Sequence, residues 1–546
     1  MSDTQGSRHD WIVLTVVCGF LFFYGLGVFG LVGADEPRYA QVAREMLERN
    51  DWVTPTLSHQ PWLEKPALLY WEQIIAFRIF GVSDWAARLP SAFSAMLMIA
   101  AIYLFLRRFR PGSELDGALM TASCAGVIGF ARAAATDMPL AANFSIALLA
   151  WYAWCESKER RWLLAAYAFL GLATLAKGPV AGAFFALILL VFAAVRKDWR
   201  LIARTLWLPG LAVYLGVTLP WFVAVQLRNR EFFRVFVLEH NLARFGTNLY
   251  RHQQPFWYFL PVALISLLPW TIFTMAALGE TIRGWRAGGR RISDHEGGID
   301  GEDGLDVFLL LWFVIPIVFF SFSQSKLPGY ILPALPAATI LVASYVRRRT
   351  SSGQAPSKVT VALHAFFAGI LAMPCLLISY LVLVHRLPWG MGTLAAGVFS
   401  ILLAAGIFAA ISGRFGLRLL HFSTLVPVLI GVAAIIRLGG AALDEEDSAR
   451  PVAVALARTE VAGATSRLPI AVFQVPRQTE YGLQFYRNQE VSSYDRGEIP
   501  AASHLLVAKE GAQGDLAKLI GSRVVTPIGS NPAQHLEYYW VSDAGR

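Results

Sequence analysis

Charged residues are scarce in this chain of 546 residues. They make up 16% of it, whereas hydrophobic residues make up 56%. In an ordinary globular protein about a quarter of the residues are charged. So little charge excludes a soluble globular protein of this length, because its apolar surface could not be hidden from water. We therefore expect a polytopic α-helical membrane protein, with lipid as the solvent for most of the chain.

Cysteine and the common cofactor motifs are also lacking. The four cysteines, at positions 18, 124, 155 and 375, lie in or beside apolar stretches, so we expect free thiols and no disulfide framework. The sequence contains no P-loop, no GxGxxG before a strand and no HExxH, and we expect no organic cofactor. The net charge of +9 indicates contact with anionic membrane lipids, and no nucleic-acid partner is expected.

Long apolar runs are what the sequence has instead. A helix needs about 20 apolar residues to cross the hydrocarbon core of a membrane, and about thirteen runs approach this length. The first is long for a signal-peptide core, which indicates a retained signal anchor. The candidate spans are residues 11–33, 86–106, 114–131, 138–154, 162–176, 178–195, 206–226, 256–276, 305–323, 329–346, 359–384, 390–411 and 419–437.

The distribution of Lys and Arg orients these spans. With the N-terminus inside, most Lys and Arg of the short loops fall on the inner side, as the positive-inside rule requires. We expect residues 1–440 to form the transmembrane domain, with outer loops at 34–85 and 227–255. Residues 441–546 are less apolar and contain short strand-like runs, which predicts a small α/β domain on the outer, periplasmic side.

The outer loops carry the residues that could do chemistry. Asp35 and Asp137 fall at the same membrane face by the span count. Each could simply cap the helix that follows it, but two carboxylates at one membrane face also favour acid/base or electrostatic work. Basic side chains in both outer loops are either solvated or bind an anionic group such as a lipid phosphate. Lys326 and Tyr330 flank a Pro-Gly corner whose simplest interpretation is a turn.

Together these motifs resemble the GT-C membrane glycosyltransferases. Within them the likeness is greatest to the 4-amino-4-deoxy-L-arabinose lipid A transferases and the dolichyl-phosphate-mannose-protein mannosyltransferases, and it covers most of the chain. One departure is Gly329, where the aminoarabinose branch more usually has Thr. The motifs are Asp35-Glu36-Pro-Arg38-Tyr, Glu64-Lys65-Pro, Thr136-Asp137-Met-Pro, Ala176-Lys177-Gly-Pro, Glu239-His240-Asn and Ser325-Lys326-Leu-Pro-Gly-Tyr330.

The resemblance implies an inverting, monomeric glycosyltransferase of the bacterial inner membrane with its active site on the periplasmic face. Its donor would be a sugar on undecaprenyl phosphate, with 4-amino-4-deoxy-L-arabinose favoured, and its acceptor a lipid A phosphate or a related periplasmic group. By the same resemblance, Asp35, Asp137 and Glu36 are expected to be catalytic, and Glu64 and His240 to hold a zinc ion. The expected lipid-phosphate ligands are Lys65, Arg38, Arg244, Lys326 and Tyr330.

Other functions stay open at this point. A relative could transfer a mannosyl or galacturonosyl group to protein or to another glycolipid. A lipid or sugar transporter, or flippase, would share the many spans, but it would place charges near the membrane midplane and broken helices in repeated halves. An O-antigen ligase or polymerase would use a diphosphate-linked donor. The gathering of charges at the outer face favours the transferase.

Overall fold

The computed structural model describes residues 2–243, 254–288, 302–373, 389–413, 416–461 and 468–542. The chain forms two compact units. The first, called here the helical unit, comprises Met1–Tyr24, Leu63–Leu69 and Leu89–Arg437. The second, called the mixed unit, comprises Gly25–Trp62, Tyr70–Arg88 and Leu438–Arg546.

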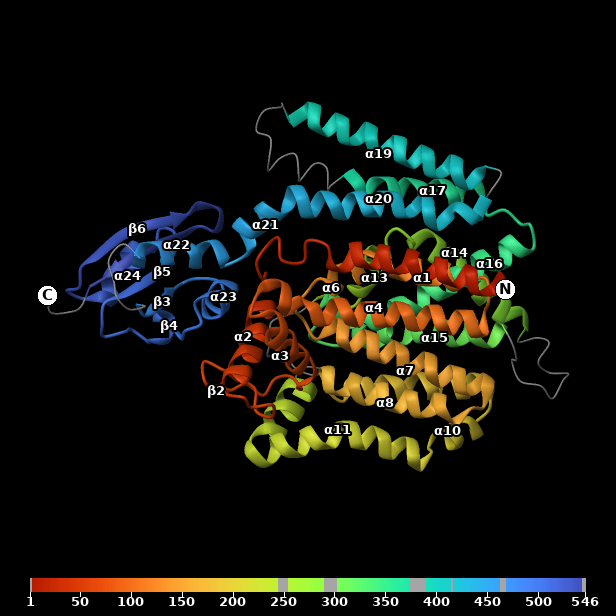
Figure 1. Cartoon of the computed structure of the whole chain (residues 1–546), viewed down its shortest axis with the longest axis horizontal. Helices are drawn as coiled ribbons and strands as arrows, with labels where there is room; N and C mark the ends of the chain where they lie inside the picture. The colour runs from red at the N-terminus through yellow and green to blue at the C-terminus, as the bar shows by residue number, and fades with distance from the viewer. Residues whose placement is uncertain are drawn as a thin grey trace. The chain divides into compact units, whose positions relative to one another are not determined.

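The helical unit is a bundle whose long helices run side by side (Figure 1). Helix α7 is enclosed by the others, since nearly all of its side chains are buried. The helices and helical turns are α1 (Ser2–Cys18), η1 (Gly19–Phe23), α4 (Asp84–Phe109), α5 (Glu114–Ala122), α6 (Ala125–Ala131), α7 (Asp137–Ser157), α8 (Arg160–Lys177), α9 (Val180–Arg196), α10 (Arg200–Thr205), α11 (Leu208–Arg228), η2 (Phe233–Ala243), α13 (Phe259–Ser266), α14 (Thr271–Gly288), α15 (Glu302–Ser321), η3 (Pro328–Ala334), α16 (Leu335–Ser351), α17 (Lys358–Ile370), α19 (Trp389–Ser412), η4 (Gly416–Leu419), α20 (Leu420–Ala434) and η5 (Ile435–Gly439).

Seven helical stretches in the described part of the chain are long and apolar enough to cross a membrane. An eighth is added if the α13–α14 pair, bent by 113°, counts as one span. The predicted polytopic helical fold is therefore confirmed, but the predicted count of about thirteen is not. Several expected spans are shorter or divided. The helical structure of the first expected span, 11–33, ends at Phe23, and the run 114–131 is split into α5 and α6.

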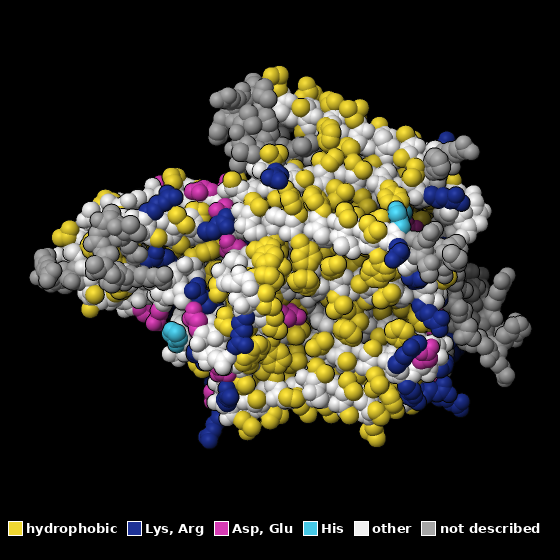
Figure 2. All heavy atoms as spheres, in the orientation of Figure 1, with side chains coloured by type: hydrophobic (Ala, Val, Ile, Leu, Met, Phe, Trp, Pro, Cys, Tyr) yellow, Lys and Arg dark blue, Asp and Glu magenta, His cyan; other side chains and the backbone are white. Residues whose placement is uncertain are grey.

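The surface of the helical unit matches a membrane environment. Hydrophobic side chains cover its long helices, and Lys and Arg gather at the end where α1 begins and α16 ends (Figure 2). Some of these cations are paired, as Arg110 is with Glu156 at 2.8 Å and Arg348 with Asp306 at 2.6 Å. The chain is thus a multi-span membrane protein with many Lys and Arg at this end, as the distribution of Lys and Arg predicts. Three of the four cysteines are buried free thiols, and the fourth, Cys375, lies outside the described residues.

The mixed unit contains a five-stranded sheet in the order β4-β3-β5-β7-β6. Strand β3 is parallel to β4 and β5, whereas β7 is antiparallel to β5 and β6. Alternate residues of the strands enter two hydrophobic clusters, one with α22 and α23 and the other with α24. The predicted α/β domain is confirmed. The strands are β3 (Ile470–Phe473), β4 (Val491–Ser493), β5 (His504–Lys509), β6 (Val525–Asn531) and β7 (Leu536–Val541), and the helices are α21 (Gly440–Asp447), α22 (Arg450–Val461), α23 (Arg477–Arg487) and α24 (Gln513–Ile520), with turns η6 (Tyr494–Arg496) and η7 (Pro532–Gln534).

The mixed unit also includes most of the first predicted outer loop. This segment forms α2 (Asp35–Glu48), a small hairpin of β1 (Thr56–Leu57) and β2 (Gln60–Pro61), and α3 (Leu68–Phe80). Helix α2 is amphipathic, and it packs against α23 of the α/β domain. Residues predicted to belong to the transmembrane domain therefore share a compact unit with the C-terminal residues.

Candidate active site

A cavity of about 420 Å³ lies within the helical unit. Most of its wall is apolar, with Leu140 and Phe144 from α7, Phe184 from α9 and Phe319 from α15. Few polar side chains interrupt this wall, and they are Lys65, Lys177, Ser323, Ser325 and Tyr330. An apolar pocket with a small number of convergent polar groups is typical of a site for an amphipathic ligand.

Lys177 is placed at the cavity by a break between two apolar helices. It is the last residue of α8, and Gly178 ends that helix with a φ of 101° before Pro179 and α9. Its ammonium lies 2.6 Å from Oδ1 of Asp137 and 5.1 Å from the ring centre of Tyr330. Lys177 is absent from the site residues predicted from the sequence. The available signal was a lone cation at the Gly-Pro junction of two apolar runs.

Asp137 begins α7 and meets the corner that contains Tyr330. A Cβ atom on Gly329 would lie 2.2 Å from Oδ1 of Asp137, so only glycine fits beside the carboxylate in this arrangement. The structure thus brings Asp137 and Tyr330, both predicted site residues, next to Lys177, and Tyr330 lines the cavity with it. The carboxylate holds the ammonium by a charge-assisted hydrogen bond.

The corner itself is held by aromatic packing and by Lys326. The ring of Tyr330 lies 4.8 Å from that of Phe320 and 6.5 Å from that of Phe259. Lys326 is buried, and its ammonium donates to the carbonyl oxygens of Ser323 at 2.5 Å and Gln254 at 3.1 Å. Burial lowers the pKa of this ammonium. Lys326 therefore stabilises the corner, and it is not among the residues that line the described cavity. Its role as a phosphate ligand stays a prediction.

Lys65 lines the cavity, as expected for a ligand of a lipid phosphate. Its ammonium lies 3.4 Å from the backbone carbonyl oxygen of Glu64. Within the described residues no three His, Cys, Asp or Glu side chains are grouped so as to hold a metal ion. The side chain of His240 and all of Arg244 lie outside the described residues. The zinc site on Glu64 and His240 and the phosphate contact of Arg244 thus stay predictions.

Asp35 and Arg38 form an ion pair in the mixed unit. Asp35 begins α2, its side chain is 55% exposed, and one carboxylate oxygen lies 2.5 Å from Nη2 of Arg38. The Arg38 side chain is only 12% exposed. Its guanidinium carbon lies 5.1 Å, 5.2 Å and 5.6 Å from the ring centres of Tyr39, Trp62 and Tyr481. Aromatic rings therefore fix the cation that orients the exposed carboxylate.

Glu36, the neighbour of Asp35, is bound by other groups of the protein. It is buried, and its two carboxylate oxygens accept from Arg88 at 3.0 Å and 2.7 Å. One of them also accepts from the backbone N–H of Val32. Arg88 is itself buried. Glu36 therefore holds its own segment of chain through Arg88 and Val32, and its catalytic role stays a prediction.

Comparison with known proteins relates the chain to membrane glycosyltransferases. Residues 64–223 match the family described as dolichyl-phosphate-mannose-protein mannosyltransferase. The undecaprenyl phosphate-alpha-4-amino-4-deoxy-L-arabinose arabinosyl transferase of Pseudomonas aeruginosa (strain UCBPP-PA14) is 32% identical over 62% of this chain and 60% of the relative. The transferase of the same name from Enterobacter sp. (strain 638) is 27% identical over 96% of both chains. The aligned part thus spans about three fifths of the first relative and nearly all of the second.

Solved structures show the same fold. The crystal structure of ArnT from Cupriavidus metallidurans bound to undecaprenyl phosphate matches with a TM-score of 0.75 and 24% identity, over 98% of both chains. The archaeal oligosaccharyltransferase AglB from Archaeoglobus fulgidus matches with a TM-score of 0.51 and 11% identity, over 94% of this chain and 70% of the other. The fold of the chain is therefore one that is also found in membrane glycosyltransferases.

Proposed function

The chain belongs to the GT-C membrane glycosyltransferases, among the aminoarabinose transferases and protein mannosyltransferases, and on this basis we propose its reaction. The proposed enzyme acts as a monomer and moves 4-amino-4-deoxy-L-arabinose from undecaprenyl phosphate to a phosphate of lipid A or to a related periplasmic acceptor. The observation that carries this proposal is the apolar cavity with Lys65 and Lys177 in its wall. The names of the relatives support the choice of sugar and lipid.

The cavity suits both the isoprenoid chain and the phosphate group of a polyprenyl phosphate. The wall of Leu, Phe, Val and Pro side chains gives an isoprenoid chain an apolar surface. Lys65 and Lys177 supply positive charge where a phosphate would lie, and the hydroxyl groups of Ser323, Ser325 and Tyr330 can donate hydrogen bonds to its oxygens. No nucleotide-binding fold is needed, because the leaving group is the lipid phosphate itself.

The proposed transfer breaks one bond and forms one. The bond between the anomeric carbon and the phosphate oxygen breaks, and that oxygen leaves with the electron pair as undecaprenyl phosphate. An oxygen of the acceptor phosphate attacks the opposite face of the sugar and forms the new bond. Lys65 and Lys177 would stabilise the charge that grows on the leaving phosphate. Asp137 would hold Lys177 in place for this work through their 2.6 Å contact.

Asp35 has a separate proposed role. A lipid A phosphate is already ionised near neutral pH, so its attack requires no general base. The exposed carboxylate of Asp35 would instead orient the acceptor or stabilise positive charge on the sugar, including that of a 4-amino group. Asp137 is less suited to pair with the amino group, because its oxygen Oδ1 is already paired with Lys177.

The proposed location is the bacterial inner membrane, with the reaction on the periplasmic face. The basic end of the helical unit supports this orientation, since Lys and Arg concentrate on the cytoplasmic side of such membranes (Figure 2). Asp137 begins α7 and Lys177 ends α8. The Arg-rich turn that joins the two helices lies at the opposite end of each. The cavity cations would then lie at the outer end of the bundle.

Transfer by purified protein tests the proposal. The full chain in lipid nanodiscs would be mixed with undecaprenyl-phosphate aminoarabinose and lipid A, and the products analysed by mass spectrometry. We expect lipid A to gain one pentosamine and undecaprenyl phosphate to be released. A product carrying a hexose or hexuronic acid, formed from the corresponding donors, would move the assignment to a mannosyl- or galacturonosyltransferase. Absence of product with every polyprenyl-phosphate sugar would overturn the proposal in favour of a transporter.

A further inference from the structure

The chain between η1 and α2 is a non-helical segment whose backbone is held almost entirely by side chains. In this segment, Gly25–Val32, Arg88 donates to the carbonyl oxygens of Leu26, Phe29 and Gly30 at 2.8 to 2.9 Å. Arg450 donates to those of Gly27 and Val28 at 3.3 Å and 2.9 Å. Backbone groups away from water need such partners. The segment therefore depends on two arginines, one of them from the C-terminal domain.

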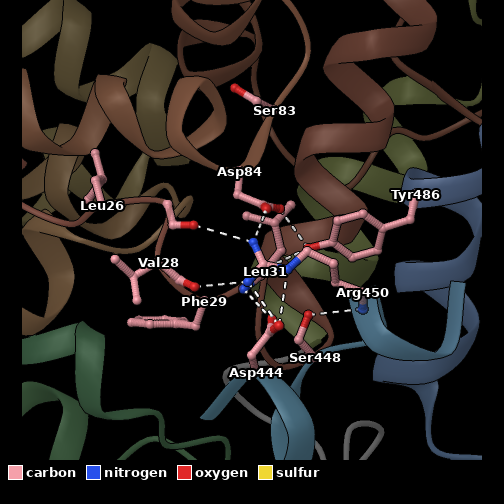
Figure 3. Close-up of polar contacts among 12 residues, drawn as sticks. Leu26, Val28, Phe29, Leu31, Ser83, Asp84, Asp444, Ser448, Arg450 and Tyr486 are labelled. Atoms are coloured by element: carbon pink, nitrogen blue, oxygen red, sulfur yellow. Dashed lines mark hydrogen bonds and ion pairs between the residues drawn. The ribbon is translucent and has the colours of Figure 1, made fainter. Parts of the chain in front are cut away.

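The backbone amides of this segment are held in the same way. The N–H of Gly30 donates to Asp444 at 2.7 Å, and that of Leu31 donates to the hydroxyl oxygen of Tyr486 at 2.6 Å. Tyr486 in turn donates to Asp84 at 2.6 Å, and Arg450 pairs with both Asp84 and Asp444 at 3.0 Å and 2.9 Å (Figure 3). We call this group of Asp84, Asp444, Arg450 and Tyr486 the polar lock.

The fit at the lock is close. A Cβ atom on Gly30 would lie 2.2 Å from Oγ of Ser448 and 2.5 Å from the hydroxyl oxygen of Tyr486. Val32 also forms an isolated antiparallel bridge with Ser448. Only glycine fits at position 30. Five residues after Gly30 the same segment enters α2 at Asp35, so any shift at the lock is passed on to the start of that helix.

Helix α23 also reaches the Asp35–Arg38 pair directly. Besides Tyr486 it carries Tyr481, whose ring centre lies 5.6 Å from the Arg38 guanidinium carbon. The carbonyl oxygen of Phe485, between them, accepts from Arg44 of α2 at 3.1 Å. One helix of the C-terminal domain thus contacts both the segment that precedes Asp35 and the cation that orients it.

We propose that the C-terminal α/β domain positions Asp35, with Tyr481 and Tyr486 of α23 as the positioning residues. This inference rests on the proposed function, in which Asp35 acts on the acceptor or the sugar. Tyr486 fixes the entry to α2 through the polar lock. Tyr481 fixes the guanidinium of Arg38, and Arg38 fixes the exposed carboxylate. Neither tyrosine needs to touch substrate.

Substitutions at Tyr481 can test the positioning role without disturbing the core of the α/β domain. It belongs to neither hydrophobic cluster of the sheet, whereas Tyr486 packs against one of them. A change at Tyr481 that keeps the aromatic ring keeps the contact with Arg38, and a change that removes the ring loses it. The pair Tyr481→Phe and Tyr481→Leu therefore differs mainly in the contact that the proposal uses.

The test compares these variants in the full chain in nanodiscs. We expect Tyr481→Leu to lower kcat about tenfold with KM for undecaprenyl-phosphate aminoarabinose unchanged, because Lys65 and Lys177 line a cavity within the helical unit. Tyr481→Phe should restore kcat. The control Lys518→Ala, which removes an exposed ion pair with Asp515 in the same domain, should leave kcat and KM unchanged. Hydrogen exchange of the α2 amides, read by mass spectrometry, should increase in Tyr481→Leu and in Tyr486→Phe only.

Two outcomes would overturn the positioning role: Tyr481→Leu as active as Tyr481→Phe, or α2 amides that exchange at the wild-type rate in both Tyr481→Leu and Tyr486→Phe. A lower kcat in Lys518→Ala as well would also overturn it, because the effect would then be general to the domain. If the wild type transfers no sugar, the proposed function fails. Hydrogen exchange still decides whether α23 holds α2.

Discussion

The cavity of the helical unit and the Gly25–Val32 segment of the mixed unit use charge in opposite ways. In the cavity, two ammonium groups stand in a mostly apolar wall, and one carboxylate, Asp137, contacts Lys177. Around the segment, Arg88 and Arg450 each combine carboxylate partners with several backbone carbonyls. In the first arrangement, ammonium groups line a cavity that a ligand could occupy. In the second, the guanidinium groups bind the protein's own backbone and carboxylates.

This difference separates the expected effects of substitution. Removing a cavity cation takes charge from the proposed phosphate site and leaves at most one carboxylate without its partner, so activity should fall more than stability. Removing a segment arginine leaves buried acceptors and a carboxylate without partners, so stability should fall first.

Replacing Arg88 should have the largest effect. Arg88→Met leaves the carboxylate of Glu36 buried without its cation, together with three carbonyl oxygens, and breaking such a buried pair costs about 3 to 5 kcal/mol. We expect a marked fall in the melting temperature of the protein in detergent. The matched control is Arg78→Met, whose guanidinium donates to the Asn50 side chain in an exposed contact and lies over the ring of Trp52. Equal melting temperatures for the two variants would contradict the structural assignment of Glu36.

Replacing Lys177 should affect activity more than stability. Lys177→Met keeps the apolar stem but removes the ammonium beside the proposed phosphate, and loss of one such stabilising group lowers turnover by about 100- to 1000-fold. The melting temperature should fall less than in Arg88→Met, because the one carboxylate that loses its partner, that of Asp137, is 17% exposed. Lys197→Met, at an exposed position after α9, removes a cation away from the cavity and should retain activity. A Lys177→Met variant with wild-type turnover would remove the cavity from the proposed site.

The features that could be predicted from the sequence are those set by local pattern. The apolar runs gave the helices of the bundle. In α2, Tyr39, Val42 and Met46 have the spacing of one helix face, and all three are buried. Lys65 could be picked out as a candidate site residue because the residues of its motif, Glu64-Lys65-Pro, are consecutive in the sequence. Such features depend on residues within a few turns of one another.

The features that could not be predicted depend on distant partners or on helix phase. Asp35 and Glu36 are adjacent, yet one is exposed and the other buried, because successive residues of a helix point about 100° apart. The ion pair of Lys177 with Asp137 joins residues 40 positions apart, and the bond from Leu31 to Tyr486 joins residues 455 apart. No local pattern carries that information.

A smaller loss of activity is expected from crowding Asp137. In Gly329→Ala the new Cβ would occupy the place of the carboxylate, 2.2 Å from Oδ1, and so displace Asp137 and the ammonium that it holds. Misplacing a catalytic group by a fraction of an ångström to an ångström lowers turnover by about 10- to 100-fold. Gly129→Ala, in α6, has no neighbouring heavy atom within 4 Å of the new Cβ and is the control. Turnover equal in the two variants would show that Asp137 does not set the position of Lys177.

The smallest expected effect concerns a carboxyl group of the mixed unit that is not paired as Glu36 is. Glu72 lies on α3, and its Oε2 is buried without a hydrogen-bond partner among the described residues. Burial raises the pKa of this carboxyl from its ordinary 4.5 to about 8. In the folded protein it stays protonated up to that pH, whereas in the unfolded chain it ionises near 4.5. Wild-type stability should therefore fall as the pH rises between these two values and level off above them.

Glu72→Gln removes the titration and keeps the shape. Its melting temperature in detergent should be close to that of the wild type near pH 5 and higher by a few degrees near pH 9. Near pH 9 the wild type must hold a buried, ionised carboxylate, whereas the variant holds a neutral amide. Glu490→Gln, at an exposed position of the same unit, should follow the wild type at both pH values. Parallel melting curves for Glu72→Gln and the wild type would mean that Glu72 has a partner when folded, and the contrast between Glu72 and the Glu36–Arg88 pair would disappear.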